Sequence, residues 1–167
     1  MTEPGTDSLA RAAAEAGMAL IESGRTLALA ESCTGGLVSA ALVSVPGISA
    51  VYRGGVVAYA DEAKCELAGV RTDLIDRHGS VSEEVAMALA EGVAARLDAE
   101  IGAAVTGVAG PSGGTPQKPI GTVWVAVTSG LSCRARLLDL GGLKDRGQIR
   151  VASAEALLSL VAETVRP

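Results

Sequence analysis

The sequence contains a single histidine, His78, no phenylalanine, one tryptophan and two tyrosines. One histidine excludes a multi-histidine metal site within one chain, and a Ser-His-Asp triad would have to use His78. Its neighbours, RHGSVSEE, predict a loop before a helix, so we interpret His78 as a surface or capping residue. The shortage of aromatic rings argues against a protein that stacks the bases of single-stranded nucleic acid.

Cysteine and positive charge are also scarce. Cys33, Cys65 and Cys133 are odd in number and form no C-x-x-C pair, which argues against a disulfide framework and a cysteine-type zinc site. Reduced thiols are typical of the cytoplasm. Lys and Arg total 14 against 19 Asp and Glu, and this negative balance would repel a nucleic-acid backbone.

Long hydrophobic runs and several familiar motifs are absent. Glu31, glycines and prolines interrupt the apolar stretches well short of the roughly 20 residues that a bilayer helix needs, and the N-terminus lacks the pattern of a signal peptide. We therefore expect a soluble, cytoplasmic protein that binds neither a membrane nor nucleic acid. The sequence has no Walker loop and no G-x-G-x-x-G, and Ala30 stands where a nucleophile elbow around Ser32 would need glycine.

The chain does have the length and the aliphatic side chains for one core. Its 167 residues, 49% of them hydrophobic, fit a single domain over 1–167 built from Ala, Val, Leu and Ile, with residues 1–7 expected to be flexible. The predicted strands are residues 26–32, 54–60, 101–107, 121–129 and 133–140, the last two forming a hairpin with Gly130 in its turn. The predicted helices run from Leu9 to a stop at Gly24, over 37–43, over 61–69, from a capping box at Ser80 and Glu83 to Leu97, and over 144–165. This order predicts an α/β fold, a layered sandwich with helices packed on a mixed central sheet.

The turn ESCTGG after the first strand is the first candidate site. Such a turn projects side chains at the edge of a sheet, and free amides at a helix start can hold an anion. The Ser32 hydroxyl could meet a substrate there, although spacing alone favours Ser32 and Thr34 as helix caps. Nothing near Cys33 in sequence lowers its pKa, so we interpret it as a small buried residue rather than a nucleophile.

Tyr59, Lys64 and two arginines form further candidates. Tyr59 and Lys64 would face different ways on one helix, but a strand end followed by a helical turn could bring them together. A lysine acts as a base only when burial or a neighbouring cation lowers its pKa, so the residues alone favour an exposed, solvated Lys64. Arg146 and Arg150 share a helix face and suit a phosphate, although a solvated charged face is the commoner arrangement.

Four long motifs, in this order, closely resemble the CinA C-terminal domain family of competence-damage-inducible proteins: ESCTGGLVSAAL, YRGGVVAYADEAK, HGSVSEEVA and TGVAGPSGGTPQKPIGTVWVAV. Characterised members of that family include nicotinamide mononucleotide amidases. The resemblance extends from about residue 8 to about residue 165. The chain is similar to the stand-alone form of the family, which lacks the molybdopterin-binding-like domain of larger members. It implies hydrolysis of the carboxamide of nicotinamide mononucleotide to nicotinic acid mononucleotide and ammonia, in pyridine nucleotide recycling, with no metal and no cofactor.

The resemblance also implies roles for matching residues. Ser32 becomes the nucleophile, with Tyr59 and Lys64 as candidates for activating it in a Ser-Lys or Ser-Tyr-Lys arrangement, since the motifs that carry these residues contain no histidine. The implied substrate-binding residues are Cys33, Thr34, Gly35 and Gly36 through their backbone amides, Thr106, Gly107 and Gly110 of the glycine-rich segment 106–115, and Arg146 and Arg150 for the phosphate.

Two alternatives stay open at this point. The chain could be a non-hydrolytic module that binds a nucleotide or a partner in competence or DNA damage responses, or a hydrolase of a related amide. The resemblance also implies a homo-oligomer, which no pattern in the sequence tests.

Overall fold

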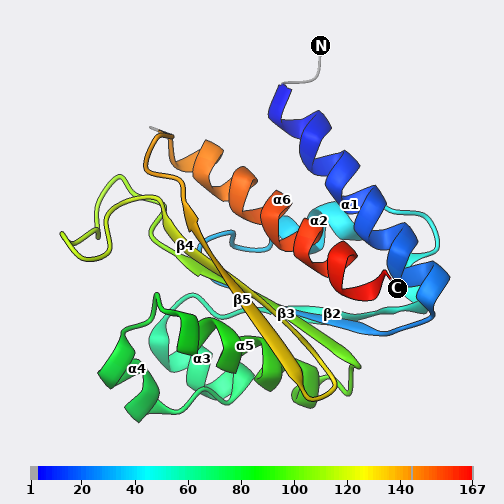
Figure 1. Ribbon diagram of the computed structural model, residues 1–167, viewed down its shortest axis with the longest axis horizontal. Helices are drawn as coiled ribbons and strands as arrows, with labels where there is room; N and C mark the ends of the chain where they lie inside the picture. The colour runs from blue at the N-terminus through cyan, green and yellow to red at the C-terminus, as the bar shows by residue number, and fades with distance from the viewer. Residues whose placement is uncertain (1–3, 144, 167) are drawn as a thin grey trace.

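The computed structural model describes residues 4–143 and 145–166, which form a mixed five-stranded sheet covered by helices on both faces (Figure 1). The strands are β1 (Leu27–Glu31), β2 (Tyr52–Val57), β3 (Ile101–Gly107), β4 (Thr122–Ser129) and β5 (Ser132–Asp139). The helices are α1 (Pro4–Ser23), α2 (Leu37–Leu42), the 3₁₀-helix η1 (Ile48–Ala50), α3 (Asp61–Ala68), α4 (Thr72–His78), α5 (Glu83–Arg96) and α6 (Arg146–Val165). The predicted α/β sandwich is confirmed.

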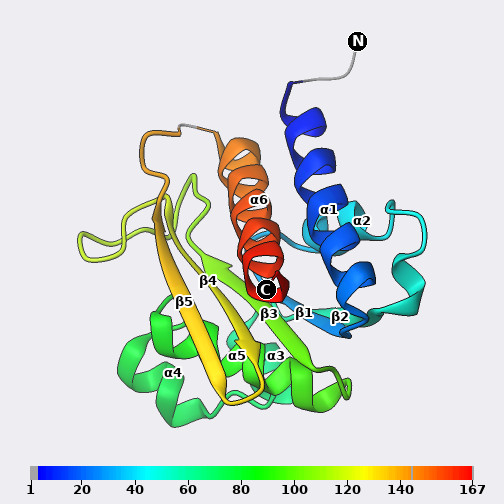
Figure 2. The ribbon, with the colours of Figure 1, turned by 45° about the vertical axis from the view of Figure 1, so that its right-hand side comes forward.

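The sheet has the order β2-β1-β3-β4-β5. β1 pairs in parallel with both β2 and β3, whereas β4 runs antiparallel to β3 and to β5. The predicted hairpin of β4 and β5 is confirmed, and it lies along one edge of the sheet (Figure 2). β1 is therefore a central strand, and all five of its residues are buried.

The two faces of the sheet carry side chains of different size. α1, α2 and α6 cover one face, and α3, α4 and α5 cover the other (Figures 1 and 2). The strands alternate, as a pleated strand must. They direct larger aliphatic residues to α1 and α6, among them Leu27, Leu29, Ile101, Val105, Val123, Val125 and Val127. They direct alanines to α5, namely Ala28, Ala30, Ala104 and Ala126.

Small residues on the second face let α5 approach closely. A Cβ added at Gly102 on β3 would lie 1.9 Å from the carbonyl oxygen of Ala90, and one at Gly92 on α5 would lie 1.6 Å from that of Ala68 on α3. Both distances are far inside van der Waals contact, so each backbone lies where only glycine leaves room for it. α3 is thereby packed tightly against α5.

Two local predictions on the loop before α5 are wrong. The capping residue of α5 is Ser82, whose hydroxyl accepts from the Val85 amide at 3.3 Å, and not Ser80. His78 does not lie in a loop, because it ends the helix α4, which the sequence did not predict. α4 has only seven residues and buries only Ile75 among its described side chains, so it shows no apolar periodicity.

Two predicted segments begin outside the residues that the structure describes. Residues 1–3 and Lys144, part of the expected flexible N-terminus and of the last predicted helix, lie outside the described residues. None of the helices in residues 4–143 and 145–166 combines the length and the hydropathy that a bilayer-spanning helix requires.

The contact between α5 and α3 gives a test of the packing. Replacing Gly92 by Ala adds about 1 kcal/mol of helix propensity, but it places a methyl group against the Ala68 carbonyl. Overpacking of this kind costs about 1–3 kcal/mol or more, so we expect Gly92→Ala to lower the free energy of unfolding by about 2 kcal/mol in urea denaturation.

The matched control is Gly142→Ala, because a Cβ at Gly142 meets no atom within 4 Å. We expect the control to change stability by less than about 0.5 kcal/mol. If Gly92→Ala were as stable as the wild type, α3 and α5 would not be packed as described.

Candidate active site

The candidate site lies at the carboxyl ends of β1, β2 and β3. The chain leaves β1 toward α2 on one face of the sheet and leaves the neighbouring β2 toward α3 on the opposite face. Open α/β sheets bind ligands at such a divergence of adjacent connections. The Ser32 amide donates to the Val105 carbonyl at 3.0 Å, and the Ala58 amide donates to the Glu31 carbonyl at 2.8 Å. The segments that carry Ser32, Tyr59 and Thr106 are therefore neighbours, although Ser32 and Thr106 are 74 positions apart (106 minus 32).

A buried carboxylate, that of Glu31, organises the turn ESCTGG. Oε2 accepts from the Thr34 hydroxyl at 2.7 Å and from the amides of Gly36 and Val38 at 3.0 Å each. Oε1 accepts from the amide of Ser39 at 2.8 Å and from its hydroxyl at 2.7 Å. Glu31 is 1% exposed, so these five hydrogen bonds replace its hydration, and the start of α2 favours its negative charge.

Glu31 thus accepts the hydrogen bonds at the start of α2 that the sequence analysis assigned to Ser32 and Thr34 as helix caps. The capping interpretation of those two side chains is wrong, because Thr34 donates to Glu31 and the N-cap of α2 is Gly36, which has no side chain to cap with. Gly36 has φ 91°, a left-handed conformation that glycine adopts without strain. The turn therefore tightens onto the carboxylate.

The Ser32 hydroxyl is left without a partner. It makes no hydrogen bond with any residue that the structure describes. Every fully buried side-chain nitrogen or oxygen in that part of the chain does have a partner, so the hydroxyl reaches solvent even though Ser32 is only 7% exposed. A hydroxyl held at a sheet edge without a structural task is free to contact a ligand.

The neighbouring Cys33 is a core residue, as predicted. It is 4% exposed and packs in the apolar cluster that contains β1 and α6. Burial raises the pKa of the Cys33 thiol to about 11, against the opposing influence of its own backbone amide and of Arg146 and Arg150. The thiol therefore stays protonated at neutral pH and is a poor nucleophile.

The backbone amides of the turn divide into two pairs. The amide of Gly35 donates to the Ser32 carbonyl at 3.0 Å, and that of Gly36 is bound by Glu31. The amides of Cys33 and Thr34 have no oxygen acceptor among the described residues. Of the four amides predicted to bind an anion, these two are the ones without an oxygen acceptor, and that of Cys33 interacts with its own thiol.

Lys64 is buried, so the expectation of an exposed, solvated lysine is wrong. Its side chain is 3% exposed, and Nζ donates to the Tyr59 carbonyl at 3.2 Å and to Asp61 Oδ1 at 3.1 Å. Lys64 and Tyr59 do come together, as predicted, but through the backbone of Tyr59.

A chain of hydrogen bonds runs from Lys64 to the end of β3. Asp61 Oδ1 also accepts from the Ser80 hydroxyl at 2.5 Å, and the Ser80 carbonyl accepts from the Thr106 hydroxyl at 2.8 Å. Burial raises the pKa of Asp61, but the hydrogen bonds from Ser80 and Lys64 and the charge of Lys64 outweigh it and hold that pKa below its usual value. Asp61 is therefore ionised at neutral pH, and Thr106 is buried as part of this chain.

The two arginines of α6 reach across to the same strand ends. Arg146 donates to the Tyr59 hydroxyl at 2.9 Å and to the Gly110 carbonyl, and Arg150 donates to the Thr34 carbonyl at 2.6 Å. A guanidinium has five N–H donors, so each arginine retains donors for a ligand. The Tyr59 side chain is 58% exposed, and its hydroxyl contacts Arg146 rather than Lys64.

The glycine-rich loop between β3 and β4 projects beyond the sheet near the start of α6 (Figure 1). Gly107 ends β3, and the buried Gly110 meets Arg146. Residues 111–116 of the loop, with Pro119 and Ile120, line a cavity of about 470 Å³. Ser32 and Lys64 do not line this cavity.

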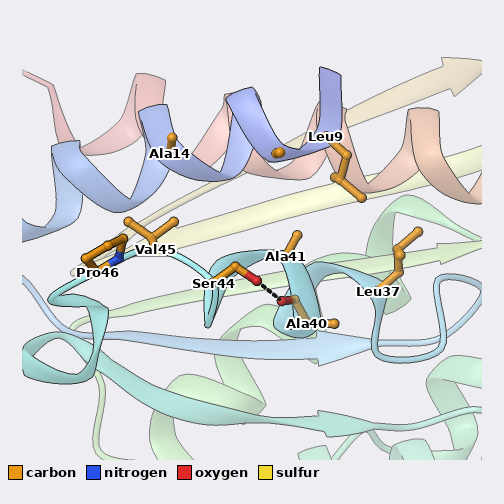
Figure 3. Close-up of a pocket in the computed structure, with 9 residues that line it drawn as sticks. Leu9, Ala14, Leu37, Ala40, Ala41, Ser44, Val45 and Pro46 are labelled. Carbon is orange, nitrogen blue, oxygen red and sulfur yellow. Dashed lines mark hydrogen bonds between the residues drawn. The ribbon is translucent and has the colours of Figure 1, made fainter. Parts of the chain in front are cut away.

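A second cavity, of about 400 Å³, lies between α1 and α2 (Figure 3). It is lined by residues of α1, of α2 and of the segment that follows α2: Leu9, Ala10, Ala14, Leu37, Ala40, Ala41, Ser44, Val45 and Pro46. Its walls are mostly apolar, and the hydroxyl of Ser44 is bound to the Ala40 carbonyl at 3.1 Å. This cavity is separate from the strand ends that carry Ser32 and Lys64.

Three residues of the candidate site were not singled out from the sequence as site residues. Asp61 lies three positions before Lys64 in a predicted helix, a spacing at which side chains meet, so it could have been found. Glu31 precedes a helix start, which favours carboxylates, but its burial gave no signal in the sequence. Ser80 reaches Asp61 across 19 positions, and no local pattern predicts that contact.

Comparisons with known proteins agree with this architecture. The model of the CinA C-terminal domain family matches residues 9–165. A CinA-like protein of Gloeobacter violaceus is 45% identical over 161 residues, which cover 96% of this chain and 38% of that protein. A CinA-like protein of Gemmatimonas aurantiaca is 50% identical over 133 residues, which cover 80% of this chain and 31% of that protein. The chain thus spans about a third of the length of the curated relatives it matches.

Solved structures are similar over nearly their whole length. The competence/damage inducible protein CihA of Agrobacterium tumefaciens superposes with a TM-score of 0.90 at 33% identity, covering 95% of this chain and 96% of its own. A competence-damaged protein (CinA) superfamily protein of Escherichia coli gives a TM-score of 0.88 at 29% identity, with 98% and 94% covered.

The Glu31 carboxylate gives a test of how the turn is held. Glu31→Ala leaves the amides of Gly36, Val38 and Ser39 without an acceptor. Each buried donor left unsatisfied costs about 1–3 kcal/mol, so we expect Glu31→Ala to lower the free energy of unfolding by about 3 kcal/mol or more in urea at pH 7.

The control is Glu66→Ala, which removes an exposed glutamate from α3 and should change stability by less than about 0.5 kcal/mol. Glu31→Gln keeps one acceptor oxygen and should fall between the two. A loss below about 1 kcal/mol in Glu31→Ala would mean that water replaces the carboxylate.

Proposed function

The chain belongs to the CinA C-terminal domain family, and from that membership and the site geometry we propose that it is an amidohydrolase of nicotinamide mononucleotide. The products are nicotinic acid mononucleotide and ammonia, and the reaction serves the recycling of pyridine nucleotides in the cytoplasm. It uses no metal or organic cofactor, since serine, lysine and backbone amides supply the groups that amide hydrolysis requires. We also propose a homo-oligomer, on the resemblance to the family.

One observation carries the proposal more than any other. The hydroxyl of Ser32 has no hydrogen-bond partner among the described residues and reaches solvent, and the buried amine of Lys64 lies at the end of the neighbouring strand. A protein that only binds a nucleotide gains nothing from burying a lysine near the strand ends that carry a free hydroxyl, because burial of a charge is costly. A hydrolase needs such a pair.

In the proposed reaction, Ser32 Oγ attacks the carbonyl carbon of the carboxamide while Lys64, as a neutral amine, takes the hydroxyl proton. The tetrahedral intermediate collapses when the C–N bond breaks and Lys64 returns the proton to the leaving nitrogen, which departs as ammonia. A water molecule then hydrolyses the acyl-serine by the same proton route. The net change is one amide and one water to one carboxylic acid and one ammonia.

The negative charge on the intermediate's oxygen needs donors that are free before the reaction begins. The amides of Cys33 and Thr34 fit this role because the turn leaves them without an oxygen acceptor, whereas those of Gly35 and Gly36 are engaged. They follow the nucleophile directly, as an amide of the oxyanion hole does in other serine hydrolases. We assign the oxyanion to these two amides.

The 5′-phosphate of the substrate requires positive charge near the same strand ends. Arg146 and Arg150 both lie close enough to Cys33 to influence its pKa, and both retain N–H donors. We assign the adjacent wall of the nucleotide site to Thr106, Gly107 and Gly110, at and just beyond the end of β3. Tyr59, exposed and bound to Arg146, then lines the path between the phosphate and the reacting carbonyl.

The proposal is tested by incubating the protein with nicotinamide mononucleotide in a metal chelator and measuring ammonia and the acid product. Ser32→Ala should reduce turnover to background, because the nucleophile is gone, and should leave the unfolding midpoint unchanged, because the hydroxyl makes no hydrogen bond with described residues. Lys64→Ala should lower kcat by about 10²–10⁴-fold, the usual contribution of a general base.

The matched control is His78→Ala, which removes a partly exposed side chain whose Nδ1 lies 3.0 Å from Glu84 Oε1. It should keep kcat within about twofold of the wild type. If His78→Ala silenced the enzyme and Lys64→Ala spared it, the serine–lysine mechanism would be wrong. A wild-type protein that binds the mononucleotide without turnover would instead be the binding module.

The role of the arginines gives a separate prediction. Because phosphate contacts position the substrate, the wild type should prefer the mononucleotide to nicotinamide riboside in kcat/KM. Arg146→Ala and Arg150→Ala should each reduce that preference by about tenfold or more, since a charged hydrogen bond contributes about 1.5–3 kcal/mol. An unchanged preference in both variants would assign the phosphate to other groups.

A further inference from the structure

We propose that Asp61 is a positioning residue, which turns Lys64 so that its lone pair faces the hydroxyl of Ser32. The inference rests on the proposed function, because it deepens the serine–lysine mechanism. Asp61 does not touch the substrate in this scheme. It acts through Lys64, to which it is bound at 3.1 Å.

The hydrogen-bond count at Lys64 is the first argument. A neutral amine has two N–H donors and one lone pair, arranged tetrahedrally around nitrogen. The described residues offer Nζ two acceptors, the Tyr59 carbonyl and Asp61 Oδ1. When both N–H groups bind these acceptors, the direction of the lone pair is fixed. Removing either acceptor lets the amine rotate about its last bond.

The second argument is that Asp61 is itself held in place. Its Oδ1 accepts from the Ser80 hydroxyl at 2.5 Å, and the Ser80 carbonyl accepts from Thr106 at 2.8 Å. The acceptor that orients Lys64 is thus anchored to the end of β3, next to the strand that carries Ser32. A carboxylate with a side chain half exposed to solvent would otherwise sample several rotamers.

A merely structural role would look different. Asp61 lies in the first turn of α3, where any carboxylate stabilises the helix by interaction with its dipole. Glu62 lies in the same turn, is also exposed and makes no hydrogen bond or ion pair within the described residues. Glu62→Ala therefore removes the same dipole interaction without touching Lys64, and it is the matched control for Asp61→Ala.

The experiment measures kcat, KM and the unfolding midpoint of Asp61→Ala, Asp61→Asn, Ser80→Ala and Glu62→Ala with nicotinamide mononucleotide. We expect Asp61→Ala to lower kcat about 100-fold with KM unchanged. Asp61→Asn keeps an acceptor oxygen and should recover kcat to within about tenfold of the wild type. Ser80→Ala should lower kcat about tenfold through the freed carboxylate, and Glu62→Ala should match the wild type in kcat.

Several outcomes would overturn the proposal: an unchanged kcat in Asp61→Ala, a loss confined to KM, or an equal loss of kcat in Glu62→Ala. If Asp61→Ala fails to fold, Ser80→Ala decides the matter, because it leaves Asp61 in place. An unchanged kcat in Ser80→Ala would then reject the positioning role, and a tenfold loss at an unchanged unfolding midpoint would support it.

A second measurement separates this inference from the choice of substrate. A fluorophosphonate reacts with an activated serine when the Ser32 oxygen bonds to phosphorus, fluoride leaves and Lys64 takes the proton. Mass spectrometry gives the rate of labelling at Ser32 without any amide substrate. Labelling of the wild type that slows about 100-fold in Asp61→Ala supports the positioning role even if the mononucleotide is not hydrolysed. Equal labelling of both proteins, or none of either, rejects it.

Discussion

The contact between the Glu31 carboxylate and the start of α2 is the interaction on which the candidate site depends. Glu31 closes β1, and its two oxygens gather three amides and two hydroxyls of the following turn. Those donors are satisfied by the carboxylate, whereas the hydroxyl of Ser32 and the amides of Cys33 and Thr34 have no oxygen partner among the described residues. The hydrogen-bond network around this carboxylate reaches β2, because Ser39 Oγ, which donates to Glu31, accepts from the Tyr52 hydroxyl at 2.9 Å. The turn that exposes the free groups is thus held by a buried charge instead of by the residues that the substrate would meet.

The fold was predictable because its signals are local. Leu9, Ala13, Ala16 and Leu20 repeat at helical spacing and are all buried, and β3 spans the predicted residues 101–107. The absence of phenylalanine correctly indicated an aliphatic core. What failed was also local: Ser80 and Glu83 have the spacing of a capping box, but Ser80 is bound by Asp61 and Thr106, so Ser82 caps α5 instead. Tertiary contacts decided between two serines two positions apart.

The site was predictable only in part, and the reason is physical. The resemblance to a family placed Ser32, Tyr59 and Lys64 in one group, and the parallel strands bring their segments to one edge. Their catalytic and binding roles stay predictions. Composition and spacing, by contrast, favoured an exposed Lys64, because burial of a lysine depends on what the rest of the fold packs over it. The hydrogen bonds of Asp61 and Ser80 join α3, the loop before α5 and β3, and contacts of this kind leave no periodic pattern in the sequence.

Because β1 lies between β2 and β3 in the sheet, its two sides are paired at different stages of synthesis. β1 pairs with β2, which follows it closely, and with β3, which ends at Gly107. A nascent chain released only as far as Glu100 has therefore exposed ESCTGG without β3, the strand that pairs with the second side of β1. Pairing of distant parallel strands is slow, because loop closure comes before the contacts that reward it. The turn ESCTGG is synthesised well before β3, so a nascent chain carries an open, aliphatic β1 edge until β3 arrives.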